Sequence, residues 1–214
     1  MLIFTYIYVK MSPELLKNKS QYKNVLSIMD SSEWLLFIST FIRRKNSVTR
    51  IYWVYLFVGL LAGVYMSLSN NVAEIEHRIW IVGLTGGLLL SLLISPVLHE
   101  LVHALSFKFF GAKTINFRWN WNLFRFNVQA NDFVLSKKSY FLICAFTFFL
   151  FSVIPLMTAF YATGVWLFVL LSLSFFHALY ALKDLAVCSY LYKFPNCYIY
   201  SSDEDKTIFY KSLP

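Results

Sequence analysis

Charged side chains are scarce in this sequence. They make up 14% of the 214 residues, whereas a typical soluble domain carries roughly 25%. Apolar residues reach 58% and aromatic residues 20%, with 22 Phe and 14 Tyr. A soluble protein of this size has too little interior to bury so much apolar sequence. The composition therefore predicts an integral membrane protein, with the lipid bilayer as its surroundings.

Cysteine is also scarce, and its spacing excludes a cysteine-based metal site. The three cysteines, Cys144, Cys188 and Cys197, have no metal-type spacing, and two of them lie in apolar stretches. Buried free thiols are therefore expected rather than a disulfide. The apolar start, MLIFTYIYVK, has no basic segment before it, so it is not expected to be a cleaved signal peptide.

The net charge of +8 could indicate nucleic-acid binding, but the arrangement of the basic residues argues against it. They are scattered at the flanks of apolar segments instead of gathering on one polar face. This distribution is typical of cytoplasmic loops under the positive-inside rule. We expect a membrane partner and no nucleic acid.

The apolar runs predict an all-α protein with four transmembrane helices, at about 51–68, 79–110, 140–161 and 165–191. The first helix and the third are preceded by clusters of Lys and Arg, while the links 69–78 and 162–164 have almost none. Both termini and the long middle loop are therefore predicted to be cytoplasmic.

Three segments follow from this pattern. Residues 1–50 form a cytoplasmic or interfacial segment, 51–192 the four-span domain and 193–214 a cytoplasmic tail. Within the first segment, 25–42 carries apolar residues at loosely helical spacing. This spacing fits a helix in the membrane interface, and a helix capping the bundle fits it equally well.

The loop between the second and third spans has a different period. Apolar and polar residues alternate from Ile115 to Trp121, and again from Phe124 to Gln129, around Asn122-Leu123. Period-two alternation on both sides of a short connection predicts a β-hairpin, at about 113–131.

The strongest motif is HELVH, His99 to His103, within the second span. On a helix, residues i and i+4 share a face, so the two imidazoles can bind one ion. Glu100 lies beside them, where a carboxylate can take a proton from an activated water. Zinc suits such ligands, and ionisable groups in a membrane helix usually mark function.

Two histidines need at least one further ligand. The candidates are His77, His177, Asp184 and Glu74 or Glu76. Counted from the outer ends of their spans, Asp184 is about level with His99, whereas His177 lies about 12 Å nearer the outer face at a rise of 1.5 Å per residue. Asp184 is therefore the predicted third ligand.

Several neighbours of the motif remain open. His177 is two helical turns from Asp184 and so faces the same way. It is predicted to line the cavity above the metal, to bind substrate, or to hold a neighbouring group by a hydrogen bond. It is equally expected to be a core histidine, and it replaces Asp184 as ligand if the helix is tilted or broken. Lys183 is expected to be a snorkelling lysine, and His77 a surface residue.

These residues carry a resemblance. HELVHALSFKFFGAK, the loop ending in LSKKSY and the downstream HALYALKDL resemble the family named "putative zincin peptidase", small bacterial membrane proteins with an HExxH motif. That family is similar to the site-2 intramembrane metalloproteases, in which a later helix supplies an aspartate. The resemblance implies zinc ligands at His99, His103 and Asp184, a general base at Glu100, and a bacterial inner membrane location.

The predicted function is that of a zinc-dependent metallopeptidase that hydrolyses peptide bonds of membrane-associated proteins. Two alternatives belong to other classes. A non-catalytic, zinc-stabilised membrane protein or adaptor would have four protein ligands. A metal transporter is less favoured, because the sequence shows no internal repeat and no second run of intramembrane acids.

Overall fold

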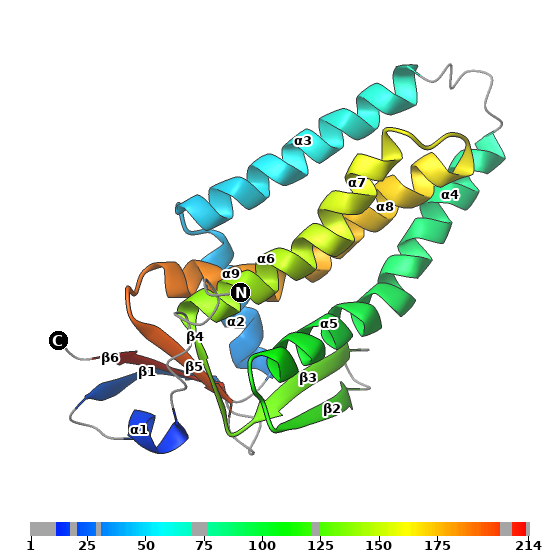
Figure 1. Ribbon diagram of the computed structural model, residues 1–214. Helices are drawn as coiled ribbons and strands as arrows, with labels where there is room; N and C mark the ends of the chain where they lie inside the picture. The colour runs from blue at the N-terminus through cyan, green and yellow to red at the C-terminus, as the bar shows by residue number, and fades with distance from the viewer. Residues whose placement is uncertain are drawn as a thin grey trace, which may run out of the picture.

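The computed structural model describes residues 12–17, 21–28, 31–69, 77–120, 125–201 and 207–212. Long helices run side by side and a small sheet lies at one end of them (Figure 1). The helices are α1 (Pro13–Lys17), α2 (Ser31–Ile42), α3 (Ser47–Ser69), α4 (His77–Leu89), α5 (Ser95–Phe109), α6 (Lys137–Phe148), α7 (Ile154–Ala159), α8 (Val165–Tyr180) and α9 (Leu182–Tyr192). The strands are β1 (Tyr22–Ile28), β2 (Thr114–Asn120), β3 (Arg125–Asn131), β4 (Phe133–Ser136), β5 (Cys197–Ser201) and β6 (Thr207–Ser212).

Three helical stretches are long and apolar enough to cross a membrane. They are Ser47–Tyr65, Arg78–Phe109 and Lys137–Ala159. The region predicted as a fourth span consists of α8 and α9, which are bent by 48° at their junction and make a fourth crossing if the pair is one span. Large apolar side chains on α3 remain exposed, for example Ile51 at 71% and Leu68 at 77%. Such a surface is stable in lipid but not in water.

Two π-helical segments interrupt these helices. Leu90–Ile94 separates α4 from α5, and Phe149–Val153 separates α6 from α7. Each segment is followed within two residues by a proline, Pro96 or Pro155. Because proline has no N–H and its ring crowds the preceding turn, a wider π turn accommodates it. The proline predicted to bend the third span thus lies just after such a turn.

Small residues allow α4 and α8 to pack closely. A Cβ built on Gly83 would meet Phe168 Cβ at 2.6 Å, and one on Gly87 would meet Val169 O at 2.4 Å. The Ser172 hydroxyl donates to the Leu84 carbonyl across the same contact, at 2.9 Å. This contact fixes the depth of α8, and therefore of His177, against the helix that leads into HELVH.

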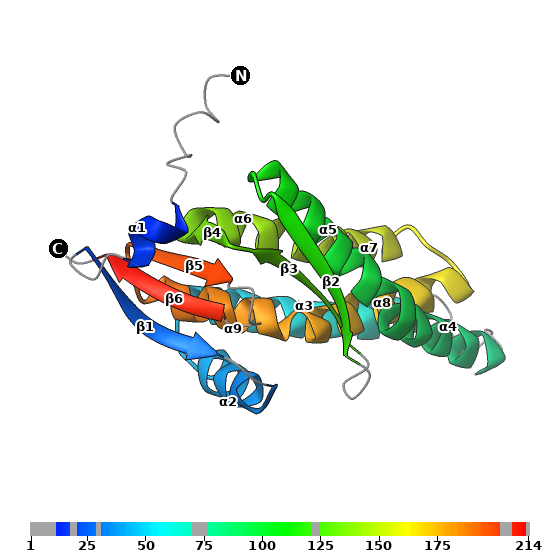
Figure 2. The same ribbon diagram turned by 90° about the horizontal axis from the view of Figure 1, so that it is seen from below.

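The predicted hairpin is confirmed. Strands β2 and β3 pair antiparallel, with Phe117 opposite Val128 and Asn116 opposite Gln129. The predicted connection around Asn122 lies outside the described residues. The hairpin runs alongside α5 (Figure 2), so the backbone of β3 reaches the HELVH motif.

A four-stranded antiparallel sheet, in the order β1-β6-β5-β4, was not predicted. The sequence-based prediction of an all-α protein with one hairpin is incomplete in this respect. The prediction of one helix over 25–42 is wrong at its start, because Val25 to Ile28 belong to β1, which pairs with β6. The pairing partner lies almost two hundred residues away, and local periodicity carries no signal of it.

The sheet packs on α2, α6 and α9 through an aromatic core. Phe209 is fully buried, and its ring lies 4.9 Å from Tyr190 and 6.0 Å from Phe37, centroid to centroid. Strands from before residue 50 and after residue 192 thus share one core with α9, the helix that carries Asp184. The sheet supports that helix from the end of the bundle (Figure 1).

Candidate metal centre

Helix α5 presents three side chains of the HELVH motif at the site. The His99 and His103 rings stack at 4.7 Å between centroids, with an angle of 17° between their planes. The two histidines and Glu100 are buried, with exposures of 3%, 5% and 8%. The i, i+4 spacing on one helix face produces this stacking, and it points both Nε2 atoms the same way.

Helix α9 brings Asp184 to these two imidazoles. Asp184 Oδ2 lies 3.0 Å from His99 Nε2 and 3.2 Å from His103 Nε2. The other carboxylate oxygen, Oδ1, accepts a hydrogen bond of 3.3 Å from the Tyr140 hydroxyl on α6. Tyr140 therefore orients the carboxylate so that one oxygen faces both histidines. Sequence reasoning missed this role, because nothing near Tyr140 in the chain indicates its distant partner.

The donor set fits a zinc ion. One ligand atom each from His99, His103 and Asp184 lies within 4.8 Å of the others. Ligand atoms at about 2.1 Å from tetrahedral zinc are roughly 3.4 Å apart, close to the two nitrogen–oxygen distances observed. His103 Nε2 is also a buried nitrogen without a hydrogen bond, since its 3.2 Å approach to Asp184 lacks hydrogen-bond geometry. Such an atom is readily explained as a metal ligand.

His177 lies behind His99 and outside the ligand group. His177 Nε2 is 3.0 Å from His99 Nδ1, and His177 Nδ1 is 2.7 Å from the Ser152 hydroxyl. Both ring nitrogens are thus occupied on the side of His99 away from Asp184. Among the roles that the sequence left open for His177, this geometry favours a hydrogen bond that orients His99. Because the chain turns at Ala181, His177 contacts Nδ1 of the His99 ring and Asp184 contacts Nε2 of the same ring.

Glu100 contacts the hairpin. Its Oε2 accepts a hydrogen bond of 2.9 Å from the Val128 backbone N–H, and its Oε1 lies 3.5 Å from the Tyr180 hydroxyl. The Val128 N–H therefore points away from β2 and towards the motif. In an antiparallel pair such outward groups recur at every second residue, so Phe126 and Ala130 also present backbone groups on this edge of β3.

The remaining candidates lie elsewhere. Glu74 and Glu76 are outside the described residues, and His77 begins α4, 22 positions before His99, or about 33 Å along a helix. Lys183 Nζ lies 4.4 Å from the centroid of the Trp34 ring, a cation–π contact at the edge of the bundle. All three cysteines are free and buried, as expected.

The fold and the site define a helical protein with spans of membrane composition and a candidate metal centre of the zincin type. The chain belongs to the family described as "Putative zincin peptidase", whose model matches residues 92–199. This range contains the HELVH motif, the hairpin, His177 and Asp184. No curated protein and no solved structure matches the chain.

Proposed function

We propose that the protein is a zinc-dependent peptidase that cleaves membrane-associated proteins. The observation that carries the proposal is the group of His99, His103 and Asp184 with Glu100 on the same helical turn. Structural zinc sites are closed by four protein ligands, whereas catalytic sites have three. Within the described residues the group has three such side chains, which favours the peptidase over the zinc-stabilised adaptor.

Zinc bound by these residues supplies Lewis-acid activation of a water molecule and of a peptide carbonyl. His99, His103 and Asp184 would hold the ion, while Tyr140 fixes the direction of the aspartate carboxylate. Glu100 takes a proton from the attacking water and delivers it to the departing amine nitrogen. Burial of Glu100 at 8% exposure keeps competing solvent away from this proton transfer.

The edge of β3 offers a place for the substrate backbone. An extended peptide that pairs with an exposed strand edge is held by main-chain hydrogen bonds, largely independent of its sequence. We place the substrate on this edge of β3, at the Val128 backbone. The Glu100–Val128 bond would then break as substrate enters, which frees the carboxylate for proton transfer when a peptide is present.

The membrane location supports substrates that are themselves membrane-associated. The motif helix is the second half of the apolar stretch Arg78–Phe109, at the end of the bundle that carries both the hairpin and the sheet (Figure 1). Under the positive-inside rule this end, rich in Lys and Arg, faces the cytoplasm. In this arrangement β1 and β6 lie on the cytoplasmic side. The resemblance to a family of bacterial membrane proteins supports the inner membrane as the location.

Metal content tests the proposal without knowledge of the substrate. Full-length protein purified in detergent with zinc present is expected to hold about one zinc per chain by mass spectrometry. His99→Ala and Asp184→Ala should lose the ion, while His77→Ala, a matched histidine outside the group, should keep it. Wild type without zinc, or Asp184→Ala with full zinc, contradicts the site.

Glu100→Gln separates catalysis from metal binding. This variant keeps the size and burial of the side chain but removes its basicity, so it should retain zinc and lose turnover of a peptide library in proteoliposomes. The alternative, a zinc-stabilised adaptor, predicts no turnover even for wild type. Turnover by Glu100→Gln at the wild-type rate would disprove the assigned role of Glu100.

A further inference from the structure

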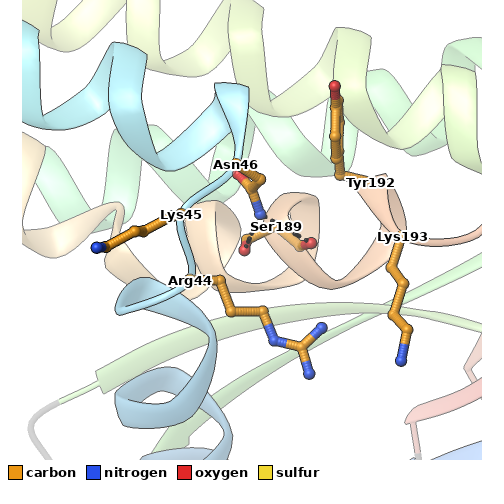
Figure 3. A pocket seen from close by; sticks show the side chains of 6 residues that line it. All are labelled: Arg44, Lys45, Asn46, Ser189, Tyr192 and Lys193. Atoms are coloured by element: carbon orange, nitrogen blue, oxygen red, sulfur yellow. Dashed lines mark hydrogen bonds between the residues drawn. The ribbon is translucent and has the colours of Figure 1, made fainter.

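A second site lies at the base of the bundle, away from the metal centre. A pocket of about 420 Å³ opens between the turn that links α2 to α3 and the end of α9. Its lining residues are Arg44, Lys45, Asn46, Ser189, Tyr192 and Lys193 (Figure 3). Three of these six side chains are cationic and none is acidic, so the pocket is electrostatically suited to an anion.

The floor of the pocket is held in place by hydrogen bonds. Asn46 Nδ2 donates to Ser189 Oγ at 2.7 Å, and Ser189 Oγ donates to the Phe41 carbonyl at 2.8 Å. These bonds fasten the α2–α3 turn to α9, with Ser189 fully buried. The cationic side chains thus project from a rigid base.

The cations around this base have no anionic partner in the described part of the chain. No acidic side chain there forms an ion pair with Arg44, Lys45 or Lys193. Arg44 is held by the face of Phe41, with its Cζ 4.1 Å from the ring centroid. In the view of Figure 3, Arg44 and Lys193 both extend below α9, whereas Lys45 extends away from these two side chains. Their charges are therefore available to a ligand.

Two neighbouring features add positive potential. The pocket adjoins the first turn of α3, where Asn46 caps the helix by accepting from the Thr49 N–H at 3.0 Å. The amino-terminal end of a 23-residue helix carries a partial positive charge. Lys137 approaches from α6 and donates to the Phe194 carbonyl at 2.8 Å, which places a further cation just beyond the end of α9.

The pocket lies at the end of a candidate membrane span, where lipid headgroups are expected. It borders the first residue of the candidate span Ser47–Tyr65 and the last residue of α9. Tyr192 is 49% exposed, and half-exposed tyrosines are typical of the membrane interface. Basic pockets between helix ends on the cytoplasmic side are suited to anionic lipid headgroups.

We propose that this pocket binds the phosphate of an anionic phospholipid, contacted by Arg44 and Lys193, with the acyl chains along α3. A bound lipid would bridge the α2–α3 turn and α9, and so brace the helix whose other end carries Asp184. The proposal rests on the membrane placement of the helices and is independent of peptidase activity, since it concerns none of the metal-ligand residues.

The test uses the full chain in a neutral detergent, titrated with fluorescent phosphatidylglycerol. The comparison ligands are phosphatidylcholine of the same chain length and soluble glycerol phosphate. The pocket variant is Arg44→Gln with Lys193→Gln. The control, Lys113→Gln with Lys138→Gln, removes two charges outside the pocket. Arg44→Lys with Lys193→Arg preserves the charge.

We expect wild type to bind phosphatidylglycerol more tightly than phosphatidylcholine. The pocket variant should lose roughly 30-fold in affinity, from about 1 kcal/mol for each basic residue at an anionic surface. The control and the charge-preserving variant should bind like wild type, and all should hold the same zinc.

Three outcomes overturn the proposal. Equal weakening in the pocket and control variants would show general surface attraction. Glycerol phosphate binding as tightly as the lipid would assign the pocket to a soluble phosphate. Equal affinity for the two lipids would show that the headgroup charge is not recognised. Zinc content is measured on the same samples, so failure of lipid binding is distinguishable from failure of the metal site.

Discussion

His177→Ala removes a group that contacts a predicted metal ligand without removing the ligand itself. If His99 binds the metal through Nε2, its proton lies on Nδ1 and is donated to His177 Nε2, 3.0 Å away. His177 then carries its own proton on Nδ1 and donates it to Ser152 Oγ at 2.7 Å. The chain of bonds selects one tautomer for each ring.

The size of the effect follows from burial. His177 is fully buried, so truncation leaves the His99 N–H unsatisfied, at a cost of about 1–3 kcal/mol. Loss of such a partner typically weakens metal binding by roughly 10–100-fold, or about 1.4–2.8 kcal/mol. His177→Ala should therefore retain zinc at saturating concentration but release it to a weaker chelator than wild type does.

Competition against a fluorescent zinc chelator measures this shift, with two variants as reference points. His99→Ala should lose zinc altogether. Ser152→Ala breaks the outer bond and leaves His177 against His99, so its zinc affinity should fall by less than about tenfold. Complete loss of zinc in His177→Ala would show that His177 is itself a ligand. An unchanged zinc affinity would show that the bond from His177 to His99 does not contribute to metal binding. Either result refutes the reasoning.

Three further predictions concern the fold that holds the site. Gly87→Ala forces α4 and α8 apart, because the new Cβ would meet the Val169 carbonyl at 2.4 Å. This substitution should cost about 1–3 kcal/mol of stability and lower the unfolding temperature. Gly86→Ala is the control and should leave the unfolding temperature unchanged, because its new Cβ lies 3.7 Å from the nearest atom. Phe209→Ala should cost about 3–5 kcal/mol in chemical unfolding, since its ring is fully buried; no loss would show that β6 is dispensable. Burial raises the pKa of the Cys197 thiol to about 11. Peptide mapping should therefore find that Cys197 is alkylated at pH 8 roughly 200-fold more slowly than an ordinary thiol of pKa about 8.5, with a rate that rises towards pH 11. Rapid labelling at pH 8 would contradict the burial of Cys197 in β5.

Sequence alone was sufficient for features that depend on local spacing. The i, i+4 spacing of His99 and His103 fixes both on one helix face, whatever surrounds the helix. The alternation around Asn122 predicts the hairpin, because strand side chains alternate between faces. Depth along two straight helices placed Asp184 level with His99, but it also placed His177 about 12 Å from that level. The second estimate is wrong, because the bend of 48° between α8 and α9 brings His177 Nε2 to 3.0 Å from His99 Nδ1.

Tertiary structure decided everything that depends on contacts between distant segments. Val25 to Ile28 form a strand instead of the expected helix because β1 pairs with β6. The hydrogen bonds to this distant strand outweigh a weak local preference for helix. The bonds of Val128 to Glu100 and of Tyr140 to Asp184 join elements with no common sequence pattern. The position of His177 depends on the bend between α8 and α9 and on the close α4–α8 contact, since packing, and not periodicity, sets how helices approach each other.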